Sequence, residues 1–316
     1  MSTQDVMSTF KTYVFRASGE ALAQNVNAFN EASRGAIQLG AAQNVGDFSH
    51  QAAFAAVKNF VRRRDPYANT SVDPTPLEML NETSVKVATG TSPVTFSPSH
   101  YRWIQENPEE AGVMLGEELA EAILQDQLNA SIIAARAAIT GNADAVYDGT
   151  ANKLDLQALL QGAAKFGDQA SQLVAWVCHS KPLHDLYSAN VANNTQLFQF
   201  GTVNIQQDGF GRILVCSDSP ALSYEDNGTF FTTLGLTQGG IKVEDNGDMD
   251  SHIETTTGRE NLVRTFQAES SFNVGVRGYA YSGAKAPTDA ELGTGASWTQ
   301  VASDVKGTAG VAVNSK

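Results

Sequence analysis

The chain has 316 residues, of which 42% are hydrophobic and 17% charged, and its formal net charge is −13 at pH 7. Single cores usually stop growing beyond about 250–300 residues, so this length suits one large irregular domain or two ordinary ones. The acidic balance argues against a nucleic-acid-binding role, because such proteins neutralise phosphates with Lys and Arg. The low share of charge fits a subunit covered by its neighbours, since interface cores are depleted in charge. It also fits a secreted β-rich adhesin.

No targeting signal is recognisable in the sequence, so we expect synthesis and assembly in the cytoplasm. The first twenty residues lack the basic start and apolar core of a signal peptide, and no later stretch approaches the roughly 18 apolar residues of a membrane span. Cys178 and Cys216 each lie in an apolar, strand-like run, where a free cysteine acts as a small hydrophobe. We therefore expect no membrane association and no disulfide.

The N-terminal third is predicted to contain little structure of its own. Residues 1–46 are polar and only weakly periodic, which predicts an arm with one or two short helices and no core. Apolar residues at helical spacing then predict a helix over 48–63. The short alternating runs 84–87 and 93–96, on either side of a Gly-containing turn, predict a hairpin. A two-stranded ribbon is marginal alone in water, so we expect this one to pack on a second subunit.

One long helix is the strongest local signal. Asn107 is a good capping residue, Pro108 fits the first helical position, and Glu109 and Glu110 suit the positive end of the helix dipole. A helix-forming run then continues to about Thr140. At 1.5 Å per residue this helix would be about 45 Å long, far above the mean for globular proteins.

The second half of the chain predicts a mixed domain followed by strands. The expected elements are helices at 154–166 and 182–192, strands at 172–179 and 213–216, a hairpin at 223–231, a strand-rich region from 241 to 281 and a Gly/Ser-rich tail from Gly283. The order is helix-rich and then strand-rich, without regular βαβ alternation. The fold class is therefore predicted to be α+β.

Motifs for catalysis, cofactors or metals are absent from the sequence. It contains no dinucleotide, phosphate-loop, HExxH or CxxC signature. Cys178 and His179 cannot act together on one strand, because adjacent side chains point to opposite faces. The acidic run 244–250 fails the EF-hand spacing and predicts a turn built on Asn246-Gly247, although a cation bound there stays open. We expect no catalytic residue, no cofactor and no metal site.

Arg62, Arg63 and Arg64 form a basic cluster in an otherwise acidic chain. They fit a solvated helix end, where cations complement the dipole. They fit an inter-subunit contact equally well, because Arg pairs with carboxylates through two parallel hydrogen bonds. A nucleic-acid patch is the weakest alternative, because no aromatic platform accompanies the cluster.

Chain order and one phrase point to a family. A polar arm, a proline-punctuated two-stranded excursion, a long helix, a mixed domain and a return to strands follow one another. The segment 210–220 (FGRILVCSDSP) is similar to the Gly-Arg-apolar-apolar-apolar-x-Ser-Asp-x-Pro phrase of many phage coat proteins, and the tail 286–292 with Trp298 is also similar to the end of such proteins. The chain thus resembles the major capsid proteins of tailed bacteriophages that have the HK97-type fold.

The resemblance implies a division of the chain into six parts. They are an N-terminal arm (1–47), an extended loop region called the E-loop (48–100), a peripheral domain with its spine helix (101–150), an axial domain (151–240), return strands of the peripheral domain (241–282) and a C-terminal segment (283–316).

The resemblance also implies what the protein does. Copies would form the pentamers and hexamers of an icosahedral virion shell, assembled in the host cytoplasm, which encloses double-stranded DNA without sequence-specific binding. The expected partners are a separate scaffolding protein and a portal, and whether a decoration protein joins them is left open. The candidate inter-subunit contact residues are Arg62, Arg63, Arg64, Lys86 and Phe96. No Lys–Asn pair of the self-crosslinking members is recognisable, so no covalent crosslink is assigned.

Three alternatives remain open at this point. An encapsulin-type compartment would use the same fold to hold cargo enzymes, and nothing in the sequence excludes it. A secreted or tail-associated adhesin predicts a β-dominated chain, which the helix at 108–140 opposes. A hydrolase with an unrecognised site would need a pocket that brings His179 or His184 to a nucleophile.

Overall fold

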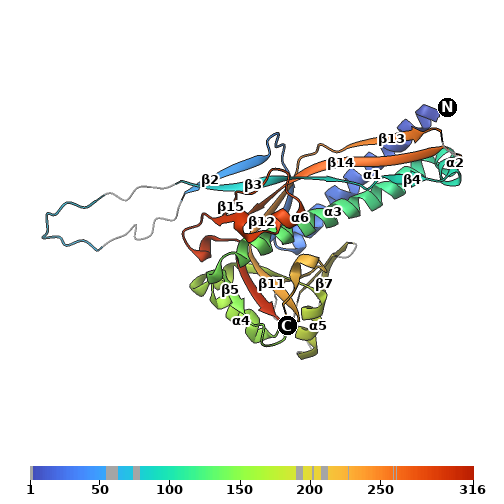
Figure 1. Ribbon diagram of the computed structural model, residues 1–316. Helices are drawn as coiled ribbons and strands as arrows, with labels where there is room; N and C mark the ends of the chain where they lie inside the picture. Colours follow the sequence, from blue (N-terminus) through green and yellow to red (C-terminus); the bar gives the residue numbers. More distant parts are fainter. Residues whose placement is uncertain are drawn as a thin grey trace.

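The molecule is long and narrow, with a wedge-shaped second part below its middle (Figure 1). The computed structural model describes residues 3–54, 63–73, 79–189, 195–200, 203–207, 213–226, 228–258, 260 and 262–316. Within these residues the chain forms helices and two sheets, one of nine strands and one of eight. The predicted α+β class is confirmed.

The elements have the following bounds. The helices are α1 (Thr3–Ala32), α2 (Pro98–Glu106), α3 (Pro108–Thr140), α4 (Leu156–Ala164), α5 (Ser180–Ala189) and α6 (Asp289–Leu292). The first sheet contains β1 (Ile37–Ala41), β2 (Phe48–Phe54), β3 (Met79–Gly90), β4 (Val94–Phe96), β12 (Ile241–Asp245), β13 (Asp250–Thr256), β14 (Val263–Val276), β15 (Tyr279–Tyr281) and β16 (Trp298–Gln300). The second contains β5 (Val146–Asp148), β6 (Leu173–Cys178), β7 (Thr195–Phe200), β8 (Val203–Gln207), β9 (Ile213–Cys216), β10 (Ser223–Glu225), β11 (Thr229–Thr237) and β17 (Gly310–Ser315).

Strand β14 is the axis of the first sheet. It is 14 residues long and is paired along both edges. Glu269, for example, pairs with Asp250 of β13 on one side and with Gly90 of β3 on the other. Strands β12 and β13 therefore follow one another along one edge of β14, and β3 and β4 along the opposite edge. The sheet is long because β14 pairs with two shorter strands, one after the other, along each of its two edges.

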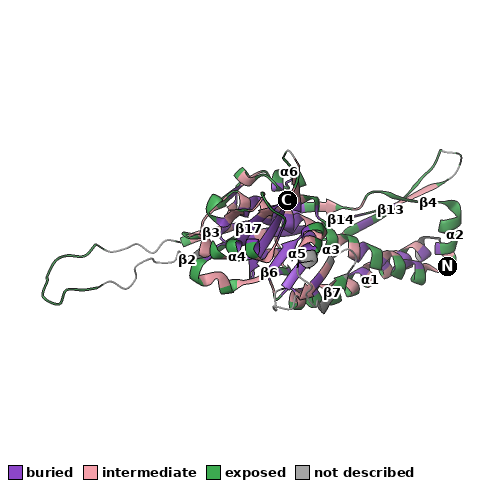
Figure 2. Ribbon diagram, turned by 90° about the horizontal axis from the view of Figure 1, so that it is seen from below, coloured by how far each residue is buried: buried purple, intermediate pink, exposed green. Residues whose placement is uncertain are grey.

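Helix α3 confirms the predicted long helix. It has 33 residues, begins at Pro108 and carries Glu109 and Glu110 in its first turn, although the side chain of Asn107 makes no capping hydrogen bond. Its inner face packs with apolar residues of β3 and β14 in the largest core cluster; these include Leu124, Leu128, Ile132, Val85, Phe272 and Val274. Figure 2 shows buried residues concentrated in the middle of the molecule, around α3, β6 and β17.

Residues 1–47 differ from their prediction. Instead of one or two short helices without a core, residues 3–32 form the single helix α1, which runs along α3 and buries Phe10, Val14 and Phe29. The two backbones approach closely at Gly116 of α3, where a Cβ atom would lie 2.7 Å from the backbone oxygen of Val14. Glycines of α3 let the two helices pack closely, so α1 needs few large apolar residues for this contact. Its apolar periodicity in the sequence is therefore weak.

The ribbon also differs from its prediction. The helix expected over 48–63 is wrong over 48–54, which forms strand β2 antiparallel to β3; residues 55–62 lie outside the described part. The runs 84–87 and 93–96 do not form a hairpin with each other, because both pair with β14. A two-stranded ribbon does exist, but its strands are β2 and β3. Both runs pair with β14, which is distant in sequence, in place of the predicted local pairing with each other.

The elements predicted between 154 and 231 are confirmed with shifted ends, and β7 and β8 add two strands that were not predicted. Helices α4 and α5 and strands β6, β9, β10 and β11 lie where the hydrophobic runs predict them. In the 210–220 phrase, residues 213–216 form β9, which pairs in parallel with β6, and residues 210–212 lie outside the described part. The C-terminal strand β17 closes this sheet between β5 and β11, so the end of the chain returns to the wedge-shaped part (Figure 1).

The acidic run 244–250 is a turn between β12 and β13, as predicted. Gly247 has φ +65°, a conformation that glycine adopts without strain. The carboxylates are used internally: Asp245 accepts a hydrogen bond from Gly247 N at 2.7 Å, and Asp248 accepts one from Ser271 N at 2.8 Å. Protein donors thus occupy oxygens that a cation would need.

Asn246, which is buried, holds this turn against β14. Its Oδ1 accepts from Asn273 Nδ2 at 2.8 Å and from Asn44 N at 3.2 Å, and its Nδ2 donates to Ser271 Oγ at 2.9 Å. One amide therefore connects three segments of the chain.

The close contact between α1 and α3 predicts an overpacking effect. Gly116→Ala should destabilise the folded subunit by about 1–3 kcal/mol, because its new Cβ meets backbone that cannot yield locally. Urea unfolding of the unassembled chain measures this. Gly19→Ala is the matched control: a Cβ there meets nothing within 4 Å, so the variant should gain up to about 1 kcal/mol of helix propensity. Equal stability of the two variants would contradict the packing of α1 on α3.

The Asn246 network predicts a second loss of stability. Asn246→Ala should cost about 1–3 kcal/mol, because buried partners lose their hydrogen bonds. Asp250→Asn, four residues away and with its side chain 90% exposed, should change stability by no more than about 0.5 kcal/mol. Both can be compared by thermal melting of the unassembled subunit. A neutral Asn246→Ala would show that solvent replaces the network.

Candidate assembly surfaces

The β2–β3 ribbon is the first candidate surface. Its strands pair from Phe48 with Val85 to Phe54 with Met79, and the inner end of β3 is fixed between β14 and β2. Of the residues between β2 and β3, the structure describes 63–73, which lie away from the body and are all exposed (Figure 1). This segment thus presents residues that do not pack on their own folded body.

The segment 63–73, here called the ribbon tip, has the composition of an interface. It carries Arg63 and Arg64, and its Tyr67 is 95% exposed. Tyr67 N donates to Asp65 Oδ1 at 2.9 Å, which fixes the turn at Pro66. Tyr and Arg are among the residue types enriched at protein interfaces. Arg62 lies outside the described residues, and Tyr67, which the sequence reasoning missed, could have been found from the large aromatic that follows Asp-Pro in a polar segment.

The remaining two candidates lie at the base of the ribbon and beyond it. Lys86 is half-buried on β3, opposite Asn273 of β14. Phe96 packs edge-to-face on Phe10 of α1, with ring centroids 6.4 Å apart. The five predicted contact residues are therefore not one cluster: Arg63 and Arg64 lie at the ribbon tip, Lys86 at its base, and Phe96 has an aromatic partner within its own chain.

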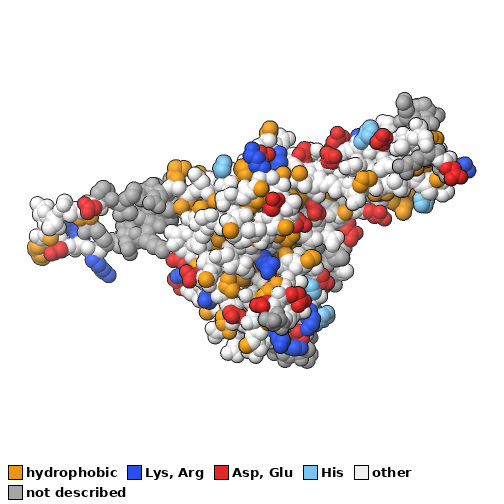
Figure 3. Space-filling view, in the orientation of Figure 1, with side chains coloured by type: hydrophobic (Ala, Val, Ile, Leu, Met, Phe, Trp, Pro, Cys, Tyr) orange, Lys and Arg blue, Asp and Glu red, His pale blue; other side chains and the backbone are white. Residues whose placement is uncertain are grey.

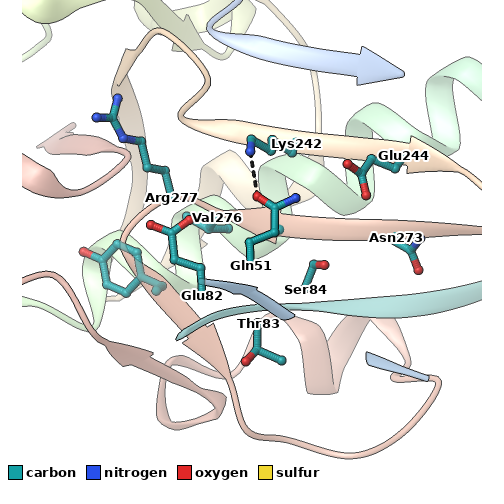
Figure 4. Close-up of a pocket in the computed structure, with 11 residues that line it drawn as sticks. Gln51, Glu82, Thr83, Ser84, Lys242, Glu244, Asn273, Val276 and Arg277 are labelled. Carbon is teal, nitrogen blue, oxygen red and sulfur yellow. Dashed lines mark hydrogen bonds between the residues drawn. The ribbon is translucent and has the colours of Figure 1, made fainter. Parts of the chain in front are cut away.

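The open face of the first sheet carries a polar hollow beside the ribbon base (Figure 4). Lys242 Nζ donates to Gln51 Oε1 at 2.8 Å, which ties β12 to β2. Glu82 Oε1 accepts from Gly278 N at 2.9 Å and ties β3 to the turn before β15. The hollow has a volume of only about 20 Å³, roughly one water molecule, so these side chains brace the ribbon and do not enclose a ligand.

A groove of about 470 Å³ lies between the second half of α1 and α3. Leu22 and Val26 of α1, Leu39 of β1, Ile123 of α3 and Met249 provide its apolar lining. Asp245 is the only ionisable lining residue. Polar side chains of Asn27, Gln127 and Ser270 complete the lining, and Gln127 Nε2 donates to Asp245 Oδ2 at 3.2 Å.

Cys178 of β6 pairs with Cys216 of β9 in the wedge-shaped part, and His179 follows Cys178 in the chain. Burial raises the pKa of the Cys178 thiol far above its usual value and raises that of Cys216 to about 11, so both thiols stay protonated at neutral pH. Hydrogen bonding from Ser180 lowers the pKa of Asp218, whose Oδ1 lies 3.5 Å from His179 Nδ1. These contacts hold the start of α5 against the end of β9.

In the described part of the chain, no three His, Cys, Asp or Glu side chains gather closely enough to hold a metal ion. None of the described helices combines the length and the apolar character that crossing a membrane requires.

Charged groups of both signs are scattered over the face that Figure 3 shows. Acidic, basic and hydrophobic side chains lie on the upper body, at the ribbon and on the wedge-shaped part. Most of the surface on this face is uncharged, in keeping with the 17% of charged residues.

Comparison of solved structures finds phage capsids of low sequence identity. The Mycobacterium phage Cain structure is 12% identical, with 90% of this chain and 88% of that chain covered and a TM-score of 0.49. For the cyanophage Pam1 capsid the corresponding values are 11%, 75%, 83% and 0.48, and for the capsid of Ralstonia phage GP4 they are 11%, 76%, 82% and 0.47. No curated protein matches the chain.

The family of the chain is shown by a match to a family model and not by these individual structures. The Gp13-like model, described as major capsid protein 13-like, matches residues 6–312. That match spans both sheets, α1 and α3. The chain therefore belongs to the Gp13-like family of major capsid proteins, which confirms the resemblance found in its sequence and makes it a structural component of a virion.

Proposed function

We propose that identical copies of this chain form the pentamers and hexamers of an icosahedral bacteriophage shell around double-stranded DNA, and that each copy lays its ribbon over an adjacent copy. The observation that carries this proposal is the ribbon itself, a two-stranded projection whose tip is fully exposed. Isolated ribbons are marginally stable in water, so this one gains from a surface on another molecule. In a shell of identical subunits, that molecule is a second copy.

The chemistry of the ribbon tip supports an acidic acceptor. Arg63 and Arg64 are planar cations that pair with carboxylates, and each copy has 34 Asp and Glu against 21 Lys and Arg. Tyr67 adds a large ring with few rotatable bonds, which contributes contact area at low entropic cost. Each such contact is modest alone. Many of them, shared among linked neighbours, give a shell that is stable as a whole.

The parts of the chain receive roles in this proposal. The arm (1–47), which contains α1, and the E-loop region (48–100) make the contacts between copies. The peripheral parts (101–150 and 241–282), which contain α3 and β14, give the subunit its length, and the axial part (151–240) points toward each local symmetry axis. The C-terminal segment (283–316) ends in the sheet of the axial part. A separate scaffolding protein, a portal and a decoration protein complete the particle.

We also propose that the chain has no catalytic role. The raised pKa values of the Cys178 and Cys216 thiols, the first buried and the second half-buried, support this, as does the use of Asp218 in holding Ser180. The DNA would be enclosed without sequence-specific contacts, because an acidic wall does not grip phosphates.

The proposal predicts that charge at the ribbon tip controls assembly and not folding. Arg63→Glu combined with Arg64→Glu should reduce the yield of closed particles at least about tenfold, because a favourable contact with carboxylates becomes a repulsive one. The melting temperature of the unassembled subunit should stay unchanged, since the ribbon tip is exposed. Size-exclusion chromatography and negative-stain electron microscopy of the chain, co-expressed with its flanking genes, measure the yield.

A matched control separates local contact from total charge. Lys165→Glu combined with Lys316→Glu also replaces two exposed cations and also moves the net charge from −13 to −17, since each reversal adds two negative charges. This variant should assemble like the parent. Normal particles from the ribbon-tip variant would refute the proposed role of the ribbon.

A further inference from the structure

The two cysteines of the chain lie directly opposite each other in the second sheet. Cys178 ends β6, Cys216 ends β9, and the two residues are register partners in this parallel pair. Two residues earlier, Trp176 and Leu214 form the equivalent pair. All four side chains pack in one apolar cluster, whereas Val177, which alternates with them, belongs to a different cluster. The two thiols therefore point to the same side of the sheet.

The spacing of the two cysteines suits a disulfide. Paired positions on neighbouring strands are about 4.8 Å apart, and disulfides usually join residues whose Cα atoms are about 4.4–6.8 Å apart. Cys178 Sγ lies 3.8 Å from the backbone oxygen of Val215, so it already approaches the neighbouring strand. Both thiols are free in the structure, and the chain has two cysteines in all. Within one subunit, each thiol therefore has the other as its sole possible disulfide partner.

Access and reactivity favour a slow reaction that begins at one of the two thiols. Cys178 is buried and Cys216 is half-buried, so a dissolved oxidant reaches Cys216 first. Burial raises the pKa of both thiols, so little of the reactive thiolate is present at neutral pH. Such a pair stays reduced during synthesis in a reducing compartment and oxidises on long exposure to an oxidant.

We infer that Cys178 and Cys216 form a disulfide within each chain after the virion has left the reducing cytoplasm of its host. The expectation of no disulfide rests on that cytoplasm, whereas disulfides persist on extracellular particles. The chain is a structural component of a virion, so it meets both environments. This inference goes beyond the proposed function, because the pair lies within a single subunit.

The oxidant in this reaction is a small-molecule disulfide such as oxidised glutathione. The sulfur of Cys216 gives up its proton and attacks that disulfide, which forms a mixed disulfide and releases one small thiol. The sulfur of Cys178 then gives up its proton and attacks Cys216 Sγ, which forms the protein disulfide and releases the second small thiol. Two protein thiols are oxidised, and one small-molecule disulfide is reduced to two thiols that carry the protons.

The bond would stabilise the wedge-shaped part. It would close a ring of chain that contains α5, β7, β8 and β9. Closing a ring removes conformational freedom from the unfolded chain, so the folded state gains stability. The bond would also lie beside Asp218, which accepts from Ser180 N at 3.0 Å and holds the start of α5. Oxidation would thus strengthen the subunit after it has been assembled.

Alkylation measures the state of the two thiols. Particles from cells lysed directly into denaturant with excess N-ethylmaleimide should carry two maleimide groups per chain. Particles first incubated with oxidised glutathione at about pH 9, and then denatured and alkylated, should carry none. At this pH more thiolate is present, so slow exchange does not limit the result. Peptide mapping should find Cys178 joined to Cys216 of the same chain, and the unassembled subunit should give the same result.

Thermal melting of the unassembled subunit measures the effect of the bond. The oxidised subunit should melt about 3–6 °C above the reduced one. Cys216→Ala is the matched control: it removes one thiol, and its melting temperature should not respond to oxidised glutathione. Two free thiols after oxidation, a stable glutathione adduct at Cys216, or a disulfide between two copies would each overturn the inference. None of these results would bear on the proposed shell, which the ribbon-tip variant tests.

Discussion

The pairing of β14 along both of its edges is the constraint on which the rest of the structure depends. A typical strand has about 5–6 residues, whereas β14 has 14, and it aligns β12 with β13 on one edge and β3 with β4 on the other. Helix α3 covers this sheet, and α1 covers α3. Because β3 extends past β14 at one end and α2 docks beside it at the other, one strand positions both the ribbon and α2.

Local signals were sufficient where an element depends on its own residues. Pro108, with Glu109 and Glu110, predicted the start of α3, and the apolar runs predicted β6 and β9. Long-range contacts decided the remainder. Helix α1 depends on close approach at Gly116, and β3 and β4 depend on β14, which lies more than 160 residues later. The periodicity of the sequence reports neither the close approach of α1 to α3 nor the pairing of β3 and β4 with β14.

The candidate contact residues also divide into those that the sequence alone could indicate and those that depend on long-range contacts. Arg63 and Arg64 could be singled out from composition alone, because three consecutive arginines are unusual in an acidic chain. Phe96 could not be judged in the same way, since its edge-to-face contact with Phe10 requires α1 to lie beside β4. The exposure of Trp103 could not be predicted from the sequence either. Its neighbours Tyr101 and Ile104 face inward, and only the docked position of α2 shows that Trp103 remains outside.

Charge explains how such a subunit can remain separate until it assembles. A net charge of −13 makes copies repel one another at random orientations, and this repulsion suppresses unspecific association. Arg63 and Arg64 at the ribbon tip are exposed cations in this acidic chain, and the exposed Tyr67 lies in the same segment. In the proposed assembly, repulsion would be relieved in orientations that bring the ribbon tip onto carboxylates of another copy. Charge would then favour one relative orientation of the copies, and the aromatic ring would add contact area to it.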